Sequence, residues 1–233
     1  KNKKKKPMLF NGPHSIDFSS NDDFYVTNYY SSEILVFDDN GFLKKKLYNS
    51  LLKGPATGFF DTKGNFWISE YKLNRLICIN PKKNIILKKI SSNKFLDNKI
   101  KKGFKGPHMC KEDINENLIF LDTWNNRLLK INKSYEFVEI LNNLTVGWTK
   151  KLVKSCNNLN CPVAINFLNN GDSLITNWGN NEILLIDNNG KLKKTINDEI
   201  FKKPYDCGFF NKNLIVANSH KGEIIIYPNR LNL

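Results

Sequence analysis

The chain has 233 residues, of which 40% are hydrophobic and 12% aromatic, so its composition excludes a disordered chain and allows one domain with a buried core. No run of about 18 apolar residues occurs, which excludes a membrane-spanning helix at the level of sequence. The formal net charge of +14 has two interpretations. The lysines attract a polyanion such as nucleic acid, or they solvate outer strands and block edge pairing.

The first segment, KNKKKKP, is basic and has no apolar stretch behind it. It therefore does not predict a signal peptide, and the localisation stays open.

Five similar hairpins then follow one another, each with two short apolar strands around a polar turn. In each hairpin a polar residue closes the first strand, and five residues later a charged residue opens the second. The hairpins are Tyr25–Phe37, Trp67–Ile79, Ile119–Ile131, Leu174–Ile186 and Ile215–Tyr227. We call the polar residues the strand-end residues; they are Asn28, Glu70, Asp122, Asn177 and Asn218. A short Asn or Asp at such a place is expected to cap the turn through its own backbone, whereas Glu70 is too long for this role.

Five prolines mark the starts of five units, and a repeat of this length with four short strands per unit is typical of a β-propeller. The sequence therefore predicts a single all-β domain over residues 1–233, with five four-stranded antiparallel blades, or six if upstream sequence is missing. The last unit lacks a complete outer strand, which either Arg230–Leu233 begins or residues 1–10 supply. The blades start near Pro13, Pro55, Pro107, Pro162 and Pro204.

The repeats resemble the NHL family. The segments DTWNNRLLKI and NWGNNEILLIDNNGKLKK match its pattern of an apolar run, a polar turn ending in Asn-Asn, a second apolar run and an Asn-Gly turn. The resemblance extends over nearly all of residues 13–227 and implies the propeller fold. It implies little about function, because such propellers have many functions.

One face of the predicted propeller is expected to bind a ligand. Two insertions, at residues 92–106 and 144–161, connect an outer strand to the next inner strand and share this top face with the hairpin turns. Aromatic side chains with a polar tip suit a binding face, although they equally suit packing between blades. The predicted ligand-binding residues are Tyr29, Tyr30, Tyr71, Trp124, Trp148, Trp178 and His220.

The residue after each proline starts an inner strand at the predicted channel mouth. Two of these residues are histidines, His14 and His108, and we expect them to point toward one axis. Converging imidazoles suit zinc or a similar ion, with Asp206, Glu70 or Asp122 as the further ligand. The alternative is a pair of histidines that bond to neighbouring backbone at the rim.

Two families of propellers support a metal at this position. The run GPHSI resembles the peptidyl-hydroxyglycine amidating lyase, an NHL-type propeller, and the resemblance implies zinc at His14 and His108. The senescence-marker and gluconolactonase propellers hold a metal such as calcium with carboxylates and amides, and here only Asp206 resembles their pattern.

Five cysteines are present. Cys78, Cys110 and Cys207 fall in predicted strands and are expected to be buried thiols. Cys156 and Cys161 share the segment SCNNLNC and would pair in an exported protein.

Three functions follow from these patterns. The first is binding of a small molecule or peptide on the top face, with or without a metal. The second is a metal-dependent enzyme of lyase or lactonase type, in which Tyr205, Glu70 or Asp206 moves a proton. The third is binding of single-stranded RNA through basic and aromatic side chains.

Overall fold

The computed structural model describes residues 9–47, 52–91, 103–136, 138–140, 159–187 and 192–227. These residues form five separate antiparallel sheets, four with four strands and one with three. The predicted all-β fold of propeller blades is confirmed. The chain divides into two compact units, Lys1–Ile90 and Ser91–Leu233, which we call unit 1 and unit 2 and describe separately.

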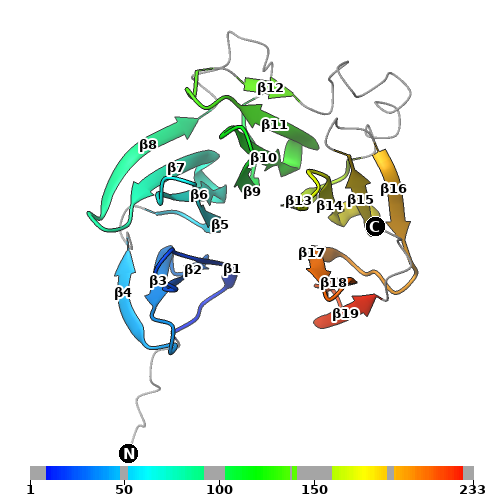
Figure 1. Cartoon of the computed structure of the whole chain (residues 1–233), viewed down its shortest axis with the longest axis horizontal. Coiled ribbons are helices and arrows are strands. Elements are labelled where there is room, and N and C mark those ends of the chain that lie inside the picture. Colours follow the sequence, from blue (N-terminus) through cyan, green and yellow to red (C-terminus); the bar gives the residue numbers. More distant parts are fainter. Residues whose placement is uncertain are drawn as a thin grey trace, which may run out of the picture. The chain divides into compact units, whose positions relative to one another are not determined.

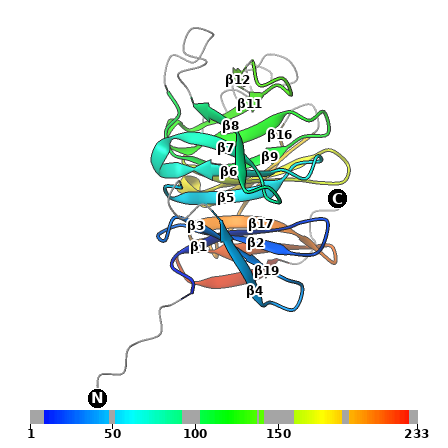
Figure 2. The same ribbon diagram turned by 90° about the vertical axis from the view of Figure 1, so that its left-hand side faces the viewer.

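Unit 1 contains two blades in which the strands lie side by side in chain order (Figures 1 and 2). In each blade we call the first strand the inner strand and the fourth the outer strand, as in the predicted propeller. Alternation along each strand places one set of apolar side chains between the two sheets. Ile34 and Val36 of blade 1 form one buried cluster with Phe66 and Ile77 of blade 2. Blade 1 is β1 (Pro13–Phe18), β2 (Phe24–Asn28), β3 (Glu33–Phe37) and β4 (Leu43–Leu47), and blade 2 is β5 (Pro55–Phe60), β6 (Phe66–Glu70), β7 (Arg75–Asn80) and β8 (Ile85–Ser91).

Unit 2 contains three blades built in the same way. Ile119 and Leu121 of blade 3 pack with Ile175 of blade 4, and Leu174 on the other face of blade 4 packs with Val216 of blade 5. Blade 3 is β9 (Pro107–Glu112), β10 (Leu118–Asp122), β11 (Arg127–Ile131) and β12 (Val138–Ile140). Blade 4 is β13 (Pro162–Phe167), β14 (Ser173–Asn177), β15 (Glu182–Ile186) and β16 (Leu192–Asn197), and blade 5 is β17 (Pro204–Phe210), β18 (Asn213–Asn218) and β19 (Glu223–Tyr227).

The sequence of the third hairpin predicts a tight turn at Asn125–Asn126, and the central hairpin turns differ from this prediction. In blades 2, 3 and 4 the turn is a three-residue 3-10 helix, as at Thr123–Asn125, and the following asparagine has a left-handed backbone. Asparagine adopts this conformation at little cost, which explains why Asn74, Asn126 and Asn181 occur at this place.

Blade 5 has three strands in the described part of the chain, as predicted. Both expected sources of a further strand, Arg230–Leu233 and most of residues 1–10, lie outside the described residues. No helix among the described residues is long and apolar enough to cross a membrane.

The three strand cysteines are buried thiols, as predicted. Burial raises the pKa of Cys78 and of Cys207 to about 12, which keeps both thiols protonated near neutral pH. The proposed pairing of Cys156 with Cys161 stays a prediction, because Cys156 lies outside the described residues.

Candidate functional site

The five strand-end residues perform one structural task in all five blades. Each is almost completely buried, at 0% to 1% exposure. A side-chain oxygen of each accepts a hydrogen bond from the backbone N–H two residues before the blade's first proline, at 2.6 to 2.9 Å. The side chain therefore fixes the segment that enters the inner strand to the hairpin in the middle of the sheet. No side-chain cap of the following turn is present at Asp122 or Asn177, which differs from the expected role, and none is present at Glu70, as expected.

The residue five positions later completes this contact in one of two ways. Where the strand-end residue is an asparagine, its amide donates to a glutamate, as from Asn177 Nδ2 to Glu182 Oε1 at 2.6 Å. Where it is an acid, it pairs with an arginine, as Asp122 with Arg127 at 2.7 Å. Glu70 pairs with Arg75 in the same manner. Glu70 thus makes the same contacts as the other strand-end residues, and proton transfer by Glu70 stays a prediction.

A bulge follows each inner-strand proline. The pairing register shifts there in all five blades, as between Pro204 and Asp206. A bulge leaves one extra residue unpaired and redirects its side chain. The side chain after the proline therefore points in a direction that a regular strand would not give it. In unit 2 the redirected residues include His108, Val163 and Tyr205.

His108 is held by two other blades of unit 2. Its Nδ1 lies 2.9 Å from the Val163 carbonyl oxygen, and its Nε2 lies 2.6 Å from the Tyr205 hydroxyl oxygen. A carbonyl can only accept, so Nδ1 carries a proton, and in the neutral ring Nε2 accepts a hydrogen bond from Tyr205. His108 is 5% exposed, whereas Tyr205 is half-buried. The pair therefore links a buried base to a hydroxyl group near the surface.

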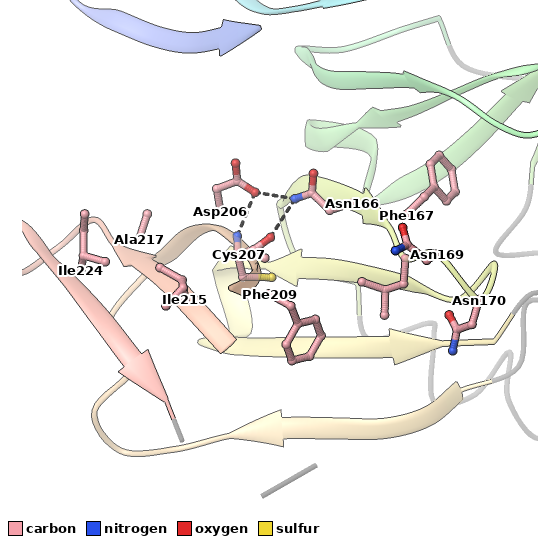
Figure 3. Close-up of a pocket in the computed structure, with 12 residues that line it drawn as sticks. Asn166, Phe167, Asn169, Asn170, Asp206, Cys207, Phe209, Ile215, Ala217 and Ile224 are labelled. Carbon is pink, nitrogen blue, oxygen red and sulfur yellow. Dashed lines mark hydrogen bonds between the residues drawn. The ribbon is translucent and has the colours of Figure 1, made fainter. Parts of the chain in front are cut away.

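Asp206, the next residue, lines an open groove of about 740 Å³ between blades 4 and 5 (Figure 3). Its Oδ1 accepts from Asn166 Nδ2 at 2.7 Å and from the Cys207 N–H at 2.8 Å. Burial raises the pKa of Asp206, while hydrogen bonds from Asn166 and Cys207 and the charge of Lys111 oppose this rise. The rest of the groove is mainly apolar and includes Phe209, Ile215, Ala217 and Ile224.

Unit 1 gathers several of the predicted aromatic residues. The His14 ring stacks on Tyr29 at 4.7 Å between centroids, and Tyr29 makes edge contacts with Tyr30 and Tyr71. The Lys72 ammonium lies 4.9 Å from the centre of the Tyr29 ring. Tyr30 is 66% exposed, so this cluster presents an aromatic edge to solvent.

Stacking of His14 predicts a pH dependence of stability. Burial lowers the pKa of His14 below its usual value of 6.5, so the folded chain binds fewer protons at this site than the unfolded chain. The contribution of His14 to the free energy of unfolding should be fully present above the unfolded-state pKa. It should be lost as the pH drops from 6.5 through the folded-state pKa. In urea titrations at about pH 7.5 and about pH 5, the loss should be smaller for His14→Phe than for the wild type. His220→Phe, a change at an exposed position, should leave the loss unchanged. An equal loss in the His14 variant would contradict this explanation.

The remaining predicted residues lie in separate places. Trp124 is 48% exposed, and His220 is also exposed. The Lys203 ammonium lies 4.2 Å from the centre of the Trp178 ring. Trp148 lies outside the described residues. Exposed lysines occur on outer strands, as at Lys44 and Lys193, and also just before inner-strand prolines, so the distribution leaves RNA binding a prediction.

The described residues do not fit a metal centre. They contain no group of three or more His, Cys, Asp or Glu side chains that could hold an ion. His108 already has a protein partner at each ring nitrogen. Because His14 and His108 lie in different units, their predicted convergence stays a prediction, as does zinc or calcium.

Sequence reasoning missed the partners of these residues. Asn166 and the Val163 carbonyl position Asp206 and His108, and neither had been singled out for this role. The sequence offers one indication of this contact, its repeat. Val163 occupies the same position after a proline as His108 and Tyr205.

Comparisons with known proteins agree with this architecture. The family model described as "NHL repeat" matches residues 10–37, which contain β1 to β3. No curated protein matches the chain in sequence.

Among solved structures, a streptogramin B lyase has a TM-score of 0.66 at 17% identity, over 97% of this chain and 72% of that chain. A catalytically inactive variant of virginiamycin B lyase from Staphylococcus aureus, solved with quinupristin, has a TM-score of 0.62 at 16% identity, over 98% of this chain and 73% of that chain. Nidogen in complex with laminin has a TM-score of 0.69 at 15% identity, over 91% of this chain and 73% of that chain. At these identities the likeness shows the fold alone.

The blades, the repeated bulge and the strand-end contacts define the class of protein: the described residues form five blades of a β-propeller. It carries an NHL repeat in its first blade.

Proposed function

We propose that the chain binds a small molecule or a peptide in unit 2, at a site formed by His108, Tyr205 and Asp206. The observation that carries this proposal is the hydrogen bond of 2.6 Å between the side chains of His108 and Tyr205, which come from blades 3 and 5. A purely structural residue at the start of an inner strand does not need this pairing, since Ala56 occupies the same position in blade 2.

The groove that Asp206 lines has the composition of a ligand site. Ligand sites are usually concave and mainly apolar, with a few polar groups that fix orientation. Here blades 4 and 5 both supply apolar lining, and the polar groups are Asp206 and three asparagines, Asn166, Asn169 and Asn170 (Figure 3). One oxygen of Asp206 is already held by the protein, and the other has no partner in the described part of the chain. A ligand with an apolar body and a hydrogen-bond donor would complement this arrangement.

Proteins of the same fold support both kinds of ligand. The virginiamycin B lyase was solved with quinupristin, and nidogen was solved with the protein laminin. The inactive variant of that lyase has alanine in place of one histidine. These precedents make quinupristin a reasonable probe for the present chain.

Isothermal titration with quinupristin tests the proposal. We expect saturable binding, and we expect Tyr205→Phe to weaken it about five- to tenfold, the effect of losing one hydrogen bond. Tyr25→Phe, which removes a hydroxyl in unit 1, is the matched control and should bind as the wild type does. Absence of binding, or an equal loss in both variants, would count against a site at Tyr205.

The same pair favours a second function, a lyase. Proton transfer from the Tyr205 hydroxyl to His108 Nε2 would leave a phenolate, while the Val163 carbonyl stabilises the imidazolium. The phenolate would remove a proton from a substrate carbon, and the electron pair of that C–H bond would form a double bond as the bond to the leaving group breaks. The leaving group would depart with the electrons of its bond and take up a proton from solvent, so no water is added. Chromatography with mass spectrometry after incubation with quinupristin should therefore separate product of unchanged total mass from the parent, and this conversion should be lost in Tyr205→Phe. A mass increase of one water molecule would identify hydrolysis instead.

A further inference from the structure

The groove that Asp206 lines contains one charged side chain, and that side chain is an acid. The other lining residues are asparagines, a cysteine, a glycine and apolar residues, and all of them belong to unit 2. The chain as a whole has a formal net charge of +14, so the charge of this groove is opposite to that of the protein. Charge complementarity therefore favours a cation over an anion as the occupant.

The hydrogen bonds around Asp206 use the donors of its neighbours. The amide nitrogen of Asn166 donates to Asp206 Oδ1 at 2.7 Å and to the Cys207 carbonyl oxygen at 2.8 Å. An amide nitrogen carries two hydrogens, so these bonds leave Asn166 only its Oδ1 atom for a ligand. The Cys207 N–H also donates to Asp206 Oδ1, at 2.8 Å. The atoms that Asp206 and Asn166 keep for a ligand are therefore both hydrogen-bond acceptors.

The two remaining oxygens point the same way. Figure 3 shows that the second carboxylate oxygen of Asp206 and Oδ1 of Asn166 are directed to the same side of the bond that joins the two residues. Burial raises the pKa of Asp206, because the surroundings compensate its negative charge less than water does. Lys111 of blade 3 acts on this carboxylate by its charge and not through a hydrogen bond. A group with a positive charge and several N–H donors would complement this pair of oxygens.

We propose that the groove binds a small molecule with a primary ammonium group on an apolar body, and that Asp206 and Asn166 hold the ammonium. This inference rests on the proposed function and names the class of its ligand. The groove volume of about 740 Å³ lies in the range of small-molecule sites. The ammonium donates to the second oxygen of Asp206 and to Oδ1 of Asn166, and the apolar body lies along Phe209 and Ile215. A carboxylate in the same place would meet two acceptors and a like charge, so the site should exclude it.

Three probes with the same apolar body test the ammonium. They are adamantylmethylamine, adamantylmethanol and adamantylacetate, which carry a cation, a neutral hydroxyl group and an anion. Isothermal titration at low salt and about pH 7.5 measures their binding, because salt screens the charge. We expect the amine to bind about tenfold more tightly than the alcohol, since a charge-assisted hydrogen bond is stronger than a neutral one. We expect no saturable binding of the carboxylate. No saturable binding of the amine, equal affinities for amine and alcohol, or tighter binding of the carboxylate would overturn the proposal.

Two variants of the protein locate the ammonium. Asp206→Asn keeps an oxygen for the donors of Asn166 and Cys207, and it places an amide nitrogen, which is a donor, where the second oxygen was. The amine should then bind within about twofold of the alcohol. Glu199→Gln removes an exposed acid of unit 2 that does not line the groove, and as the matched control it should keep the tenfold preference. An equal loss of preference in both variants would overturn the proposal. Circular dichroism checks that both variants fold, and the comparison of probes on the wild type holds if Asp206→Asn does not.

The results separate this inference from the proposed function. If quinupristin binds and the binding depends on Tyr205, while the amine has no advantage over the alcohol, the ligand site stands and the ammonium class is wrong. If neither quinupristin nor any of the three probes binds, both proposals are wrong.

Discussion

Replacing Asp122 by asparagine should destabilise the protein by about 3–5 kcal/mol, which is the usual cost of removing one partner of a buried ion pair. Arg127, its partner, has a side chain that is only 10% exposed. The arginine would keep its contact with the Gly103 carbonyl, but its ion pair with Asp122 would be lost. Urea unfolding followed by circular dichroism measures the effect.

The double variant Asp122→Asn/Arg127→Glu should recover most of this loss. It changes blade 3 to the pairing that blades 1, 4 and 5 already use, in which an asparagine amide donates to a glutamate at 2.6 to 3.1 Å. Asn125 would then donate a hydrogen bond to the introduced carboxylate, as Asn180 of blade 4 donates to Glu182.

Arg127→Glu alone is the control for this double variant, and it should be strongly destabilising because two acids then meet in a buried place. The expected result is therefore a double variant more stable than either single variant. A double variant whose loss equals the sum of the two single losses would contradict the idea that the two pairings are interchangeable.

Replacing Gly58 by alanine should cost about 1–3 kcal/mol through overpacking. A Cβ atom at Gly58 would lie 2.3 Å from Cζ and 2.7 Å from Cε1 of Phe66. The Phe66 ring cannot move away easily, because it is 0% exposed and lies against Tyr25 and Phe60, with ring centres 5.1 and 4.9 Å away. The expected decrease in melting temperature is about 2–9 °C.

Two further variants test this cause. Gly208→Ala is the matched control, because an added Cβ there meets no atom within 4 Å, and it should change the melting temperature little. In Gly58→Ala/Phe66→Leu, the smaller side chain should make room for the methyl group, so the combined loss should be less than the sum of the single losses. Full additivity, or an equal effect at Gly208, would show that the close contact with Phe66 is not the cause.

The repeated hairpins and prolines allowed most of the fold to be predicted. In blade 4 the sequence predicts strands at Val163–Phe167, Ser173–Thr176, Glu182–Ile186 and Lys191–Ile196. The third has the observed bounds, the first two differ by one residue at one end, and the fourth differs by one residue at each end. These features depend on alternation and turn residues, which are local properties of the chain. The turn near Asn125 was less well predicted, because a tight turn and a short 3-10 helix accept the same residues.

The candidate site was predictable only in part. The position after each proline was recognised, and two of its occupants, His108 and Tyr205, do meet. Their hydrogen bond joins residues 97 positions apart, and no local pattern indicates which nitrogen receives the hydroxyl or that Val163 supplies the carbonyl. Asp206 was singled out for its charge, but its orientation depends on Asn166 of the neighbouring blade.

The order of residues alone determined five repeats, their all-β character and the polar residue that ends the second strand of each blade, because short-range sterics and alternation control all three. Only the tertiary structure decided what that polar residue binds: the backbone N–H two residues before the proline, on a segment brought near by packing of the sheet. It also decided that the apolar strand Glu223–Tyr227 has an open edge in the described chain. Burial and partnership across sheets depend on which elements lie side by side, and a repeating sequence gives its last strand the same side chains whether or not a neighbour covers it.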